Sequence, residues 1–262
     1  MEVSIVFTDL DRTLLEPDGR LGQEAAGAVA QLRELGIPVV PLTSKTKEEL
    51  QAWLEVLNAG GVGVFENGAG VVTPAGVETL PGAVPLECLS EIFADLRQRL
   101  GPGLVPLHEL PDGELTLRTG LEGEAIRRAL ARGWDLPFLA PIAAEEGLRA
   151  AVQDIPAVRL LRGGSFWHLC GRHDKGGAVP RVVEKLGRPG RTVGLGDAPN
   201  DAGFLGLVDV PVLVPGPFGV DQCLRDAIPA ARVAPQPFGE GWAAAVRAIL
   251  DEAPDGSSGE AD

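Results

Sequence analysis

Two groups of carboxylates each follow a short apolar run of the sequence, and together they have the chemistry of a divalent cation site. Asp9 and Asp11 come directly after the first apolar run, and Asp197 and Asp201 follow a second one. If both runs are strands of one open parallel sheet, these side chains share the edge where ligands bind. Converging carboxylates repel one another unless a cation lies among them, and an all-oxygen donor set suits Mg²⁺.

Each group alone has a simpler interpretation. Asp11 could lie in a solvated loop or cap a helix, and Asp197 could cap a helix that begins near Pro199. Asn200 adds an amide beside the second pair of carboxylates. Taken together, the two groups favour a Mg²⁺ site held by the side chains of Asp9 and Asp197 and by the backbone carbonyl of Asp11.

Two smaller signals add hydroxyl groups and positive charge. Thr43, Ser44 and Lys45 follow another apolar run, at 37–42, so we expect them at the same sheet edge. Lys175 opens a predicted helix, where its charge opposes the helix dipole, and a nearby anion would offset that cost. A surface lysine is the simpler alternative, although the chain has few lysines and two of them lie in these motifs.

The elements that must position these residues alternate between strands and helices. This alternation predicts an α/β fold, with a Rossmann-like parallel sheet and helices on both of its faces. Pro41 has no N–H for a sheet, so we expect it near the end of its strand. The predicted strands are 5–7, 37–42, 62–65, 191–195 and 212–214, and the predicted helices are 23–35, 46–57, 174–186 and 241–250.

The middle of the chain has a different pattern, which predicts a smaller inserted α+β domain over 84–170. The core domain then comprises 1–83 and 171–262, with an acidic, Gly/Ser-rich tail at 253–262 that we expect to be disordered. Within the insert we expect helices at 86–100, 122–130 and 143–152, an alternating strand at 114–119, and a hairpin of 158–161 with 166–169 through the turn 162–165.

Composition narrows the range of partners. The formal net charge of −14 disfavours nucleic acid and anionic lipid as partners. No apolar run is long enough for a membrane span, and three widely spaced cysteines suit a reducing cytoplasm. We expect a cytoplasmic monomer or homodimer. High Pro content and few thermolabile residues suggest a thermophile, and a GC-rich genome would explain the same bias.

Taken in order, the motifs resemble those of the haloacid dehalogenase superfamily of phosphatases. They are Asp-x-Asp-x-Thr from Asp9, then Thr43, then Lys175, then Gly-Asp-x-x-Asn-Asp from Gly196. The insert is similar to the large cap of the Cof-type sugar phosphatases. Within that group, three segments, 42–46, 66–69 and 163–168, most resemble the mannosyl-3-phosphoglycerate phosphatases. The chain departs from the wider group at Arg12, where Gly is common, and at Ser44-Lys45, where many members have Gly-Arg.

The chemistry of phosphate esters and the resemblance agree on the catalytic roles. Asp9 is the expected nucleophile, because a carboxylate can form an aspartyl phosphate, and Asp11 is the general acid and base. Thr43 and Lys175 are expected to contact the phosphoryl group, and Asn200 and Asp201 to orient Lys175 and the water molecules on the metal.

The resemblance implies a small anionic sugar phosphate as substrate and a compatible solute, mannosylglycerate, as product. The same-class alternatives are glucosyl-3-phosphoglycerate and sucrose phosphate. A sugar phosphotransferase or mutase and a non-catalytic binding module remain as alternatives from other classes. Arg118 is a further cationic candidate for the substrate carboxylate, and Trp167 is expected in the core. The expected substrate-binding residues are Ser44, Lys45, Glu66, Asn67, Gly68, Arg162, Ser165 and His168.

Overall fold

The computed structural model describes residues 2–57, 59–162, 166–187 and 190–252 of the chain, which divide into two compact units. Among these residues, no helix has the length and apolarity needed to cross a lipid bilayer. The first unit comprises Met1–Leu42, Val56–Gly60 and Val179–Asp262, and the second comprises Thr43–Glu55 and Gly61–Ala178.

The first unit is built on a five-stranded parallel sheet in the order β12-β11-β10-β1-β2. Strand β1, which lies between β10 and β2, is rich in β-branched residues and buried along nearly its whole length, as expected of a strand covered on both faces. The predicted α/β fold with a parallel sheet is confirmed. The strands are β1 (Val3–Thr8), β2 (Val39–Pro41), β10 (Arg191–Gly196), β11 (Val210–Leu213) and β12 (Arg232–Val233), so that Pro41 ends its strand as predicted.

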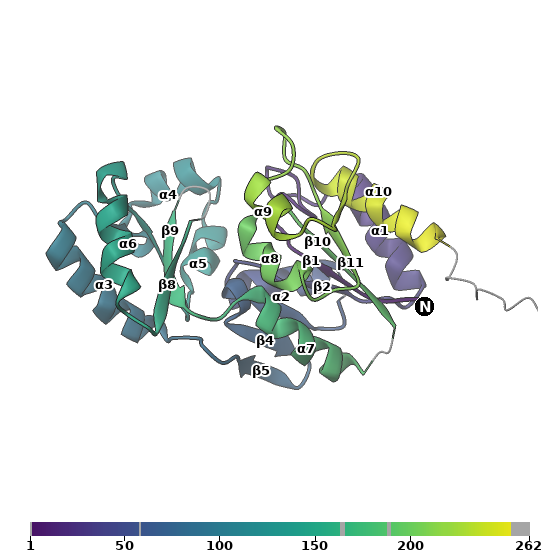
Figure 1. The fold of residues 1–262 in the computed structure, drawn as a ribbon, viewed down its shortest axis with the longest axis horizontal. Helices are drawn as coiled ribbons and strands as arrows, with labels where there is room; N and C mark the ends of the chain where they lie inside the picture. The colour runs from purple at the N-terminus through teal and green to yellow at the C-terminus, as the bar shows by residue number, and fades with distance from the viewer. Residues whose placement is uncertain (1, 58, 163–165, 188–189, 253–262) are drawn as a thin grey trace, which may run out of the picture. The chain divides into compact units, whose positions relative to one another are not determined.

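The helices of the first unit pack through narrow apolar stripes. In α1 the buried residues are Ala25, Ala28, Val29 and Leu32, which share one face at helical spacing. Figure 1 shows α1 and α10 side by side, next to the sheet. The helices are α1 (Gln23–Glu34), η4 (Pro199–Asp201), α8 (Ala202–Leu205), α9 (Gln222–Ala227), α10 (Phe238–Asp251) and most of α7 (Lys175–Leu186).

The second unit contains a small antiparallel sheet, β3-β4-β5. The predicted strand at 62–65 forms as β3, but its partner is β4, so the expectation that it continues the parallel sheet is wrong. The reason is the turn at Glu66–Gly68, which reverses the chain and brings β4 back alongside β3. The elements are most of α2 (Lys47–Leu57), then β3 (Gly63–Phe65), η1 (Glu66–Gly68), β4 (Gly70–Thr73) and β5 (Gly76–Thr79).

The remainder of the second unit is a four-stranded antiparallel sheet, β6-β7-β9-β8, with helices packed on it. Leu136, Phe138, Trp167 and Leu169 alternate along β7 and β9 and bury one face of the sheet against the helices. The elements are α3 (Leu86–Leu100), β6 (Val105–Pro106), η2 (Leu107–Glu109), α4 (Asp112–Thr119), α5 (Glu124–Leu130), β7 (Asp135–Leu139), η3 (Ile142–Ala144), α6 (Glu145–Gln153), β8 (Val158–Arg162) and β9 (Trp167–Gly171).

The segment predicted as a strand at 114–119 is instead the helix α4, so that prediction is wrong. Its apparent alternation is not a buried stripe, because Leu115 is buried whereas Leu117 is 86% exposed. The helix is fixed at its ends by Pro111 and by Gly120, which takes the left-handed conformation that favours glycine after a helix.

The strand β7 was not predicted, because Pro137 lies within it. A proline removes a ladder donor and usually excludes a central strand. Here β6 pairs only with Phe138 and Leu139, so the chain beside Pro137 has a neighbour on one side alone. The proline is therefore tolerated, as it is on an edge strand.

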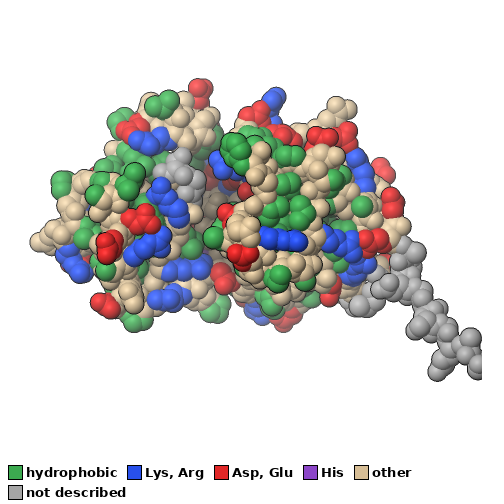
Figure 2. All heavy atoms as spheres, turned by 45° about the horizontal axis from the view of Figure 1, so that its top comes forward, with side chains coloured by type: hydrophobic (Ala, Val, Ile, Leu, Met, Phe, Trp, Pro, Cys, Tyr) green, Lys and Arg blue, Asp and Glu red, His purple; other side chains and the backbone are tan. Residues whose placement is uncertain are grey.

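The other predicted elements of the middle segment are confirmed within a few residues. The strands of the expected hairpin pair antiparallel as β8 and β9, whereas its turn falls largely on 163–165, outside the described residues. The tail at 253–262, which is expected to be disordered, also lies outside the described residues. The domain boundaries at 84 and 170 stay a prediction. Figure 2 shows acidic and basic side chains interspersed on one face.

Candidate active site

Three carboxylates meet in the first unit. Asp9, Asp197 and Asp201 each offer an oxygen, and these oxygens lie within 4.8 Å of one another. Asp9 follows the last residue of β1 and Asp197 follows the last residue of β10. Since β1 connects onward to β2 on one side while β10 lies on its other side, this is a topological switch point, where open parallel sheets bind ligands.

Asp197 and Asp201 are oriented by hydrogen bonds. The buried hydroxyl of Thr13 donates to Oδ1 of Asp197 at 2.9 Å. The carboxylate of Asp201 accepts from the backbone N–H groups of Asp197 and Ala198, at 3.0 and 3.1 Å. A Cβ at Gly196 would lie 2.7 Å from this carboxylate, so the glycine makes room for Asp201.

Asp9 is fixed by the sheet and by the residue before it. Its backbone N–H donates to the carbonyl of Leu195 at 3.0 Å, which extends the β1–β10 ladder. Thr8 donates to the carbonyl of Asp9 at 2.6 Å and accepts from the indole N–H of the buried Trp242 at 2.9 Å. Asp9 is only 6% exposed, so little water can screen its charge.

The donor set fits a hard divalent cation. Carboxylate oxygens are the ligands that Mg²⁺ prefers, and three of them in so small a volume repel one another unless positive charge lies among them. Two of the three predicted metal residues, Asp9 and Asp197, belong to this group. Asp11 was predicted to act through its backbone carbonyl, and that role stays a prediction. Asp201, expected to orient its neighbours, contributes the third carboxylate.

In the second unit, the loops 43–45 and 66–68 are hydrogen-bonded to each other. The carbonyl of Thr43 accepts from the N–H of Asn67, and the carbonyl of Lys45 accepts from the N–H of Glu66, both at 2.9 Å. The hydroxyl of Thr43 in turn accepts from the N–H of Lys45 at 3.1 Å. These contacts bring together Thr43, Lys45, Glu66 and Asn67, which are four of the predicted site residues.

Gly68 and Lys175 also meet in the second unit. Gly68 has a φ of 97°, and a Cβ there would lie 1.9 Å from the carbonyl oxygen of Asp174. Only glycine therefore lets this turn pack against the start of α7. Lys175 is the first residue of that helix and is buried, with 1% of its surface exposed.

The carboxylate of Glu66 contacts backbone N–H groups of the segment before β7. It accepts from Gly133 at 3.0 Å and from Trp134 at 2.8 Å. Burial raises the pKa of Glu66 to about 7, against the lowering effect of Arg132 and of these N–H groups. Whether Glu66 also contacts substrate, as the sequence predicts, stays a prediction.

A buried ion cluster was not predicted from the sequence. Asp135 is fully buried, and its Oδ2 accepts from Arg132 Nη1 at 2.6 Å and contacts His168 Nδ1 at 2.8 Å. Arg132 also donates to the carbonyl of Ser44 at 3.2 Å. The segment 132–135 therefore joins three predicted substrate-binding residues, Ser44, Glu66 and His168.

The remaining predicted residues lie elsewhere or outside the described residues. Arg162 is exposed and stacks over the ring of Trp167, with the guanidinium carbon 4.8 Å from the ring centre. Trp167 is in the core, as expected. Arg118 forms an ion pair with Glu114 along α4, at 2.8 Å. Ser165 is not among the described residues.

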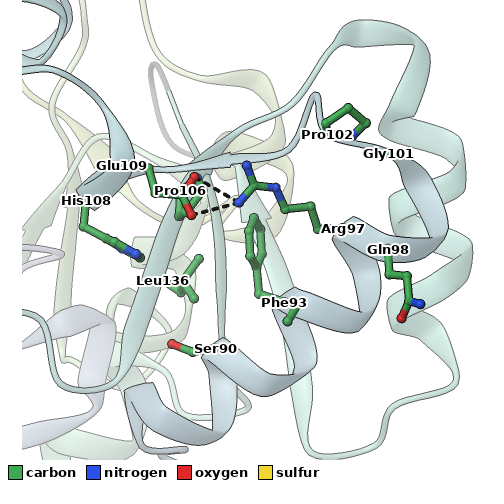
Figure 3. Close-up of a pocket in the computed structure, with 11 residues that line it drawn as sticks. Ser90, Phe93, Arg97, Gln98, Gly101, Pro102, Pro106, His108, Glu109 and Leu136 are labelled. Atoms are coloured by element: carbon green, nitrogen blue, oxygen red, sulfur yellow. Dashed lines mark hydrogen bonds and ion pairs between the residues drawn. The ribbon is translucent and has the colours of Figure 1, made fainter.

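A cavity of about 540 Å³ in the second unit is lined by other residues, chiefly of α3 and η2. Figure 3 shows Phe93 and Leu136 among the lining residues, with Arg97 hydrogen-bonded to Glu109 near them. None of its lining residues was predicted at the site. The chemistry therefore lies with the carboxylates and not with this cavity.

Solved structures similar to this one define its class of fold. A haloacid dehalogenase-like hydrolase from Bacteroides thetaiotaomicron matches with a TM-score of 0.70 and 13% identity, over 95% of this chain and 98% of that one. A haloacid dehalogenase-like hydrolase from B. subtilis matches with a TM-score of 0.69 and 16% identity, over 96% and 100%. The chain thus has the fold of the haloacid dehalogenase-like hydrolases, and that resemblance is confirmed.

Two sequence relatives align with most of this chain. Two proteins, both named glucosyl-3-phosphoglycerate/mannosyl-3-phosphoglycerate phosphatase, are each 28% identical to this chain. The one from Persephonella marina aligns over 95% of this chain and 97% of its own length, and the one from Methanococcoides burtonii over 82% and 86%. No family model matches the chain.

Proposed function

We propose that this chain is a Mg²⁺-dependent phosphatase that hydrolyses mannosyl-3-phosphoglycerate to mannosylglycerate and phosphate. The observation that carries the proposal is the meeting of Asp9, Asp197 and Asp201 at the switch point of the parallel sheet. The activity named for both relatives supports a phosphoric monoester hydrolase that takes a small sugar phosphate.

The reaction proceeds in two displacements. A carboxylate oxygen of Asp9 attacks the phosphorus, the bond to the leaving oxygen breaks, and Asp11 donates a proton to that oxygen. Water then attacks the aspartyl phosphate, Asp11 takes a proton from it, and inorganic phosphate leaves. Asp11 thus returns to its starting state, and no further reactant is needed.

The side chains of Asp9 and Asp197 and the backbone carbonyl of Asp11 would hold Mg²⁺. When bound, the ion offsets the repulsion between the nucleophile and the anionic phosphoryl group. Asp201 and Asn200 orient their neighbours, in keeping with the two N–H groups that Asp201 accepts from.

The hydroxyl of Thr43 and the ammonium group of Lys175 stabilise the transferring phosphoryl group. The candidates to bind the sugar and the carboxylate of the substrate are Ser44, Lys45 and the turn 66–68. Glucosyl-3-phosphoglycerate is a second candidate substrate, because both relatives are named for the two compounds together. The product is a compatible solute, which suits a cytoplasmic enzyme of a thermophile.

The test is phosphate release from mannosyl-3-phosphoglycerate, glucosyl-3-phosphoglycerate and sucrose phosphate, each with Mg²⁺ or with EDTA. We expect the fastest release from the mannosyl compound, none in EDTA, and none from Asp9→Asn. Asp154→Asn changes an exposed carboxylate at the end of α6 and serves as the control. Turnover that is indifferent to metal, or near-normal in Asp9→Asn, would contradict the proposal. Phosphoryl transfer to an added sugar in preference to water would identify a phosphotransferase.

A further inference from the structure

A chain of two hydrogen bonds in the first unit runs from α10 to the backbone of Asp9. The indole Nε1 of Trp242 donates to the hydroxyl of Thr8 at 2.9 Å, and that hydroxyl donates to the carbonyl of Asp9 at 2.6 Å. Thr8 and Trp242 are both fully buried, so water cannot take the place of either partner. The two bonds therefore link α10 directly to the residue that we expect to be the nucleophile.

The donors and acceptors of this chain can run in one direction only. An indole N–H only donates, so Trp242 occupies a lone pair of the Thr8 hydroxyl and leaves its single proton for another acceptor. That acceptor is the backbone carbonyl of Asp9. Trp242 thus favours the side-chain rotamer of Thr8 in which the hydroxyl points at Asp9.

Both peptide groups that flank the Cα of Asp9 are held. The N–H on one side donates to the carbonyl of Leu195 at 3.0 Å, and the carbonyl on the other side accepts from Thr8. Peptide groups are planar, so holding both of them leaves little freedom in the backbone torsions of Asp9. Together they set the direction of the Cα–Cβ bond along which the carboxylate leaves the sheet.

The first turn of α10 is itself held against the loop that follows β1. A Cβ at Gly239 would lie 2.8 Å from the carbonyl oxygen of Leu14, so only glycine lets the helix approach this closely. Phe238 begins the helix with a φ of 53°, in the left-handed region. Such strained residues persist where their surroundings hold them, and they gather at functional sites. The close approach and the strained start both fix the place of Trp242 relative to the loop.

We propose that Thr8 is a positioning residue for the nucleophile, and that Trp242 holds Thr8 in the orientation that this role needs. The proposal rests on the phosphatase function given above, because it concerns how Asp9 is aimed at phosphorus. Thr8 acts through the backbone of Asp9 and not on the reacting atoms. A nucleophile displaced by about 1 Å reacts up to about 100-fold more slowly, so a bond that sets its direction has a measurable effect.

Three variants test the role of the Thr8 hydroxyl. Thr8→Val keeps the shape of the side chain and removes the hydroxyl, Thr8→Ser keeps the hydroxyl, and Thr192→Val is the matched control. Thr192 lies at the start of β10 in the same sheet, whereas the carboxylates follow the strand ends. Its hydroxyl also donates one bond and accepts one, both with Asp209. We measure the free energy of unfolding and kcat/KM for p-nitrophenyl phosphate, which reports phosphoryl transfer to Asp9.

We expect Thr8→Val to lower kcat/KM per folded molecule by about tenfold, the effect of one hydrogen bond on the barrier. Thr8→Ser should keep most of the activity, and Thr192→Val should leave kcat/KM unchanged although both valine variants lose stability. A purely structural role would lower the free energy of unfolding in both valine variants and change kcat/KM in neither. That outcome, or equal losses of kcat/KM in Thr8→Val and Thr8→Ser, overturns the proposal.

Trp242→Phe tests the other end of the chain, and it carries the test if Thr8→Val does not fold. The substitution removes the indole N–H and keeps an aromatic ring in the core. It should lower kcat/KM by less than Thr8→Val does, and it should lower it no further when the two are combined, because Trp242 acts through Thr8. Unchanged kcat/KM in Trp242→Phe, or additive losses in the double variant, overturns the role of Trp242.

The indole N–H of Trp242 gives a readout that does not depend on activity. The chain has four tryptophans, and the indole signal that Trp242→Phe removes from the proton–nitrogen NMR spectrum belongs to Trp242. In Thr8→Val this N–H loses its acceptor, so we expect its proton signal to move upfield; an unmoved signal overturns the proposal.

The failure of this inference is distinguishable from the failure of the proposed function. If the unaltered protein releases phosphate from neither mannosyl-3-phosphoglycerate nor p-nitrophenyl phosphate, the proposed function fails. If it hydrolyses them and Thr8→Val behaves like Thr192→Val, only the present inference fails.

Discussion

The hydroxyl of Thr13 donates to Oδ1 of Asp197 at 2.9 Å, although 184 positions separate the two residues in the chain. Thr13 is fully buried in the loop that follows β1, and Asp197 begins the loop that follows β10. The bond therefore ties the two acidic loops together at the switch point. Thr13 was seen in the sequence only as part of a motif, with no role of its own.

Removing this bond should weaken metal binding more than folding. Thr13→Val keeps the shape of the side chain but removes the hydroxyl that donates to Asp197, and such indirect contacts are worth about tenfold or more in metal affinity. We expect the Mg²⁺ concentration for half-maximal activity to rise by about tenfold in Thr13→Val. Thr13→Ser keeps the hydroxyl and should stay near the unaltered value. Equal Mg²⁺ dependence in the two variants would show that the bond does not orient Asp197.

The acidic site could be predicted because its position follows from local pattern. Asp9 and Asp197 each follow a β-branched run, and parallel strands bring their carboxyl ends to one edge. The third carboxylate, Asp201, was predicted among the converging acidic residues, but in an orienting role and not as a metal ligand. Its place depends on Gly196, whose missing side chain gives it room, and a sequence does not display such a contact.

The cluster around Asp135 could not be predicted in the same way. The cluster depends on the pairing of β7 with β9, and β7 was not predicted because Pro137 lies within it. Arg132 and Asp135 then looked like ordinary charged residues in a loop. The one available signal was the alternation of Leu136 and Phe138 on either side of the proline, which a search for short buried strands would have found.

Arg12 should be replaceable by glycine with a gain in stability. Its φ of 62° lies in the left-handed region, and it is an exposed residue where the wider group often has Gly. A non-glycine residue there costs about 1 kcal/mol. Chemical denaturation of Arg12→Gly should show a free energy of unfolding higher by about that amount. Arg12→Ala keeps the backbone cost and should show no such gain; a gain of the same size in both would mean that the arginine side chain, and not its backbone, is unfavourable.

The buried Glu66 should make stability depend on pH in the opposite sense from most carboxylates. Its pKa is raised to about 7 in the folded chain, chiefly by burial, whereas in the unfolded chain it returns to the ordinary value near 4.5. Between those values the folded state holds a proton that the unfolded state has lost, so stability falls as pH rises. Glu66→Gln resembles the protonated form and can still accept from the N–H groups of Gly133 and Trp134.

We therefore expect the two proteins to be about equally stable at pH 4.5. By pH 7.5 the free energy of unfolding of the unaltered protein should be lower than that of Glu66→Gln by about 3 kcal/mol. Urea denaturation of both proteins across this range measures the difference, and other titrating groups cancel in the comparison. A difference that stays constant, or that grows in favour of Glu66 as pH rises, would show that its carboxylate is ionised throughout.

Gly68 should be among the least replaceable glycines of the second unit, for a reason that a matched glycine isolates. Both Gly68 and Gly120 have positive φ values, 97° and 72°, so an alanine at either position would hold an unfavourable backbone conformation. A Cβ at Gly120 meets nothing within 4 Å, whereas at Gly68 it overlaps the carbonyl of Asp174. Gly120→Ala should lower the free energy of unfolding by about 1 kcal/mol, and Gly68→Ala by about 3 kcal/mol or more because the turn must also move.

The same movement should affect activity. Since it displaces the start of α7, where Lys175 lies, phosphatase activity per folded molecule should fall in Gly68→Ala and not in Gly120→Ala. Similar losses of stability in the two variants would mean that the turn shifts away from α7 at little cost.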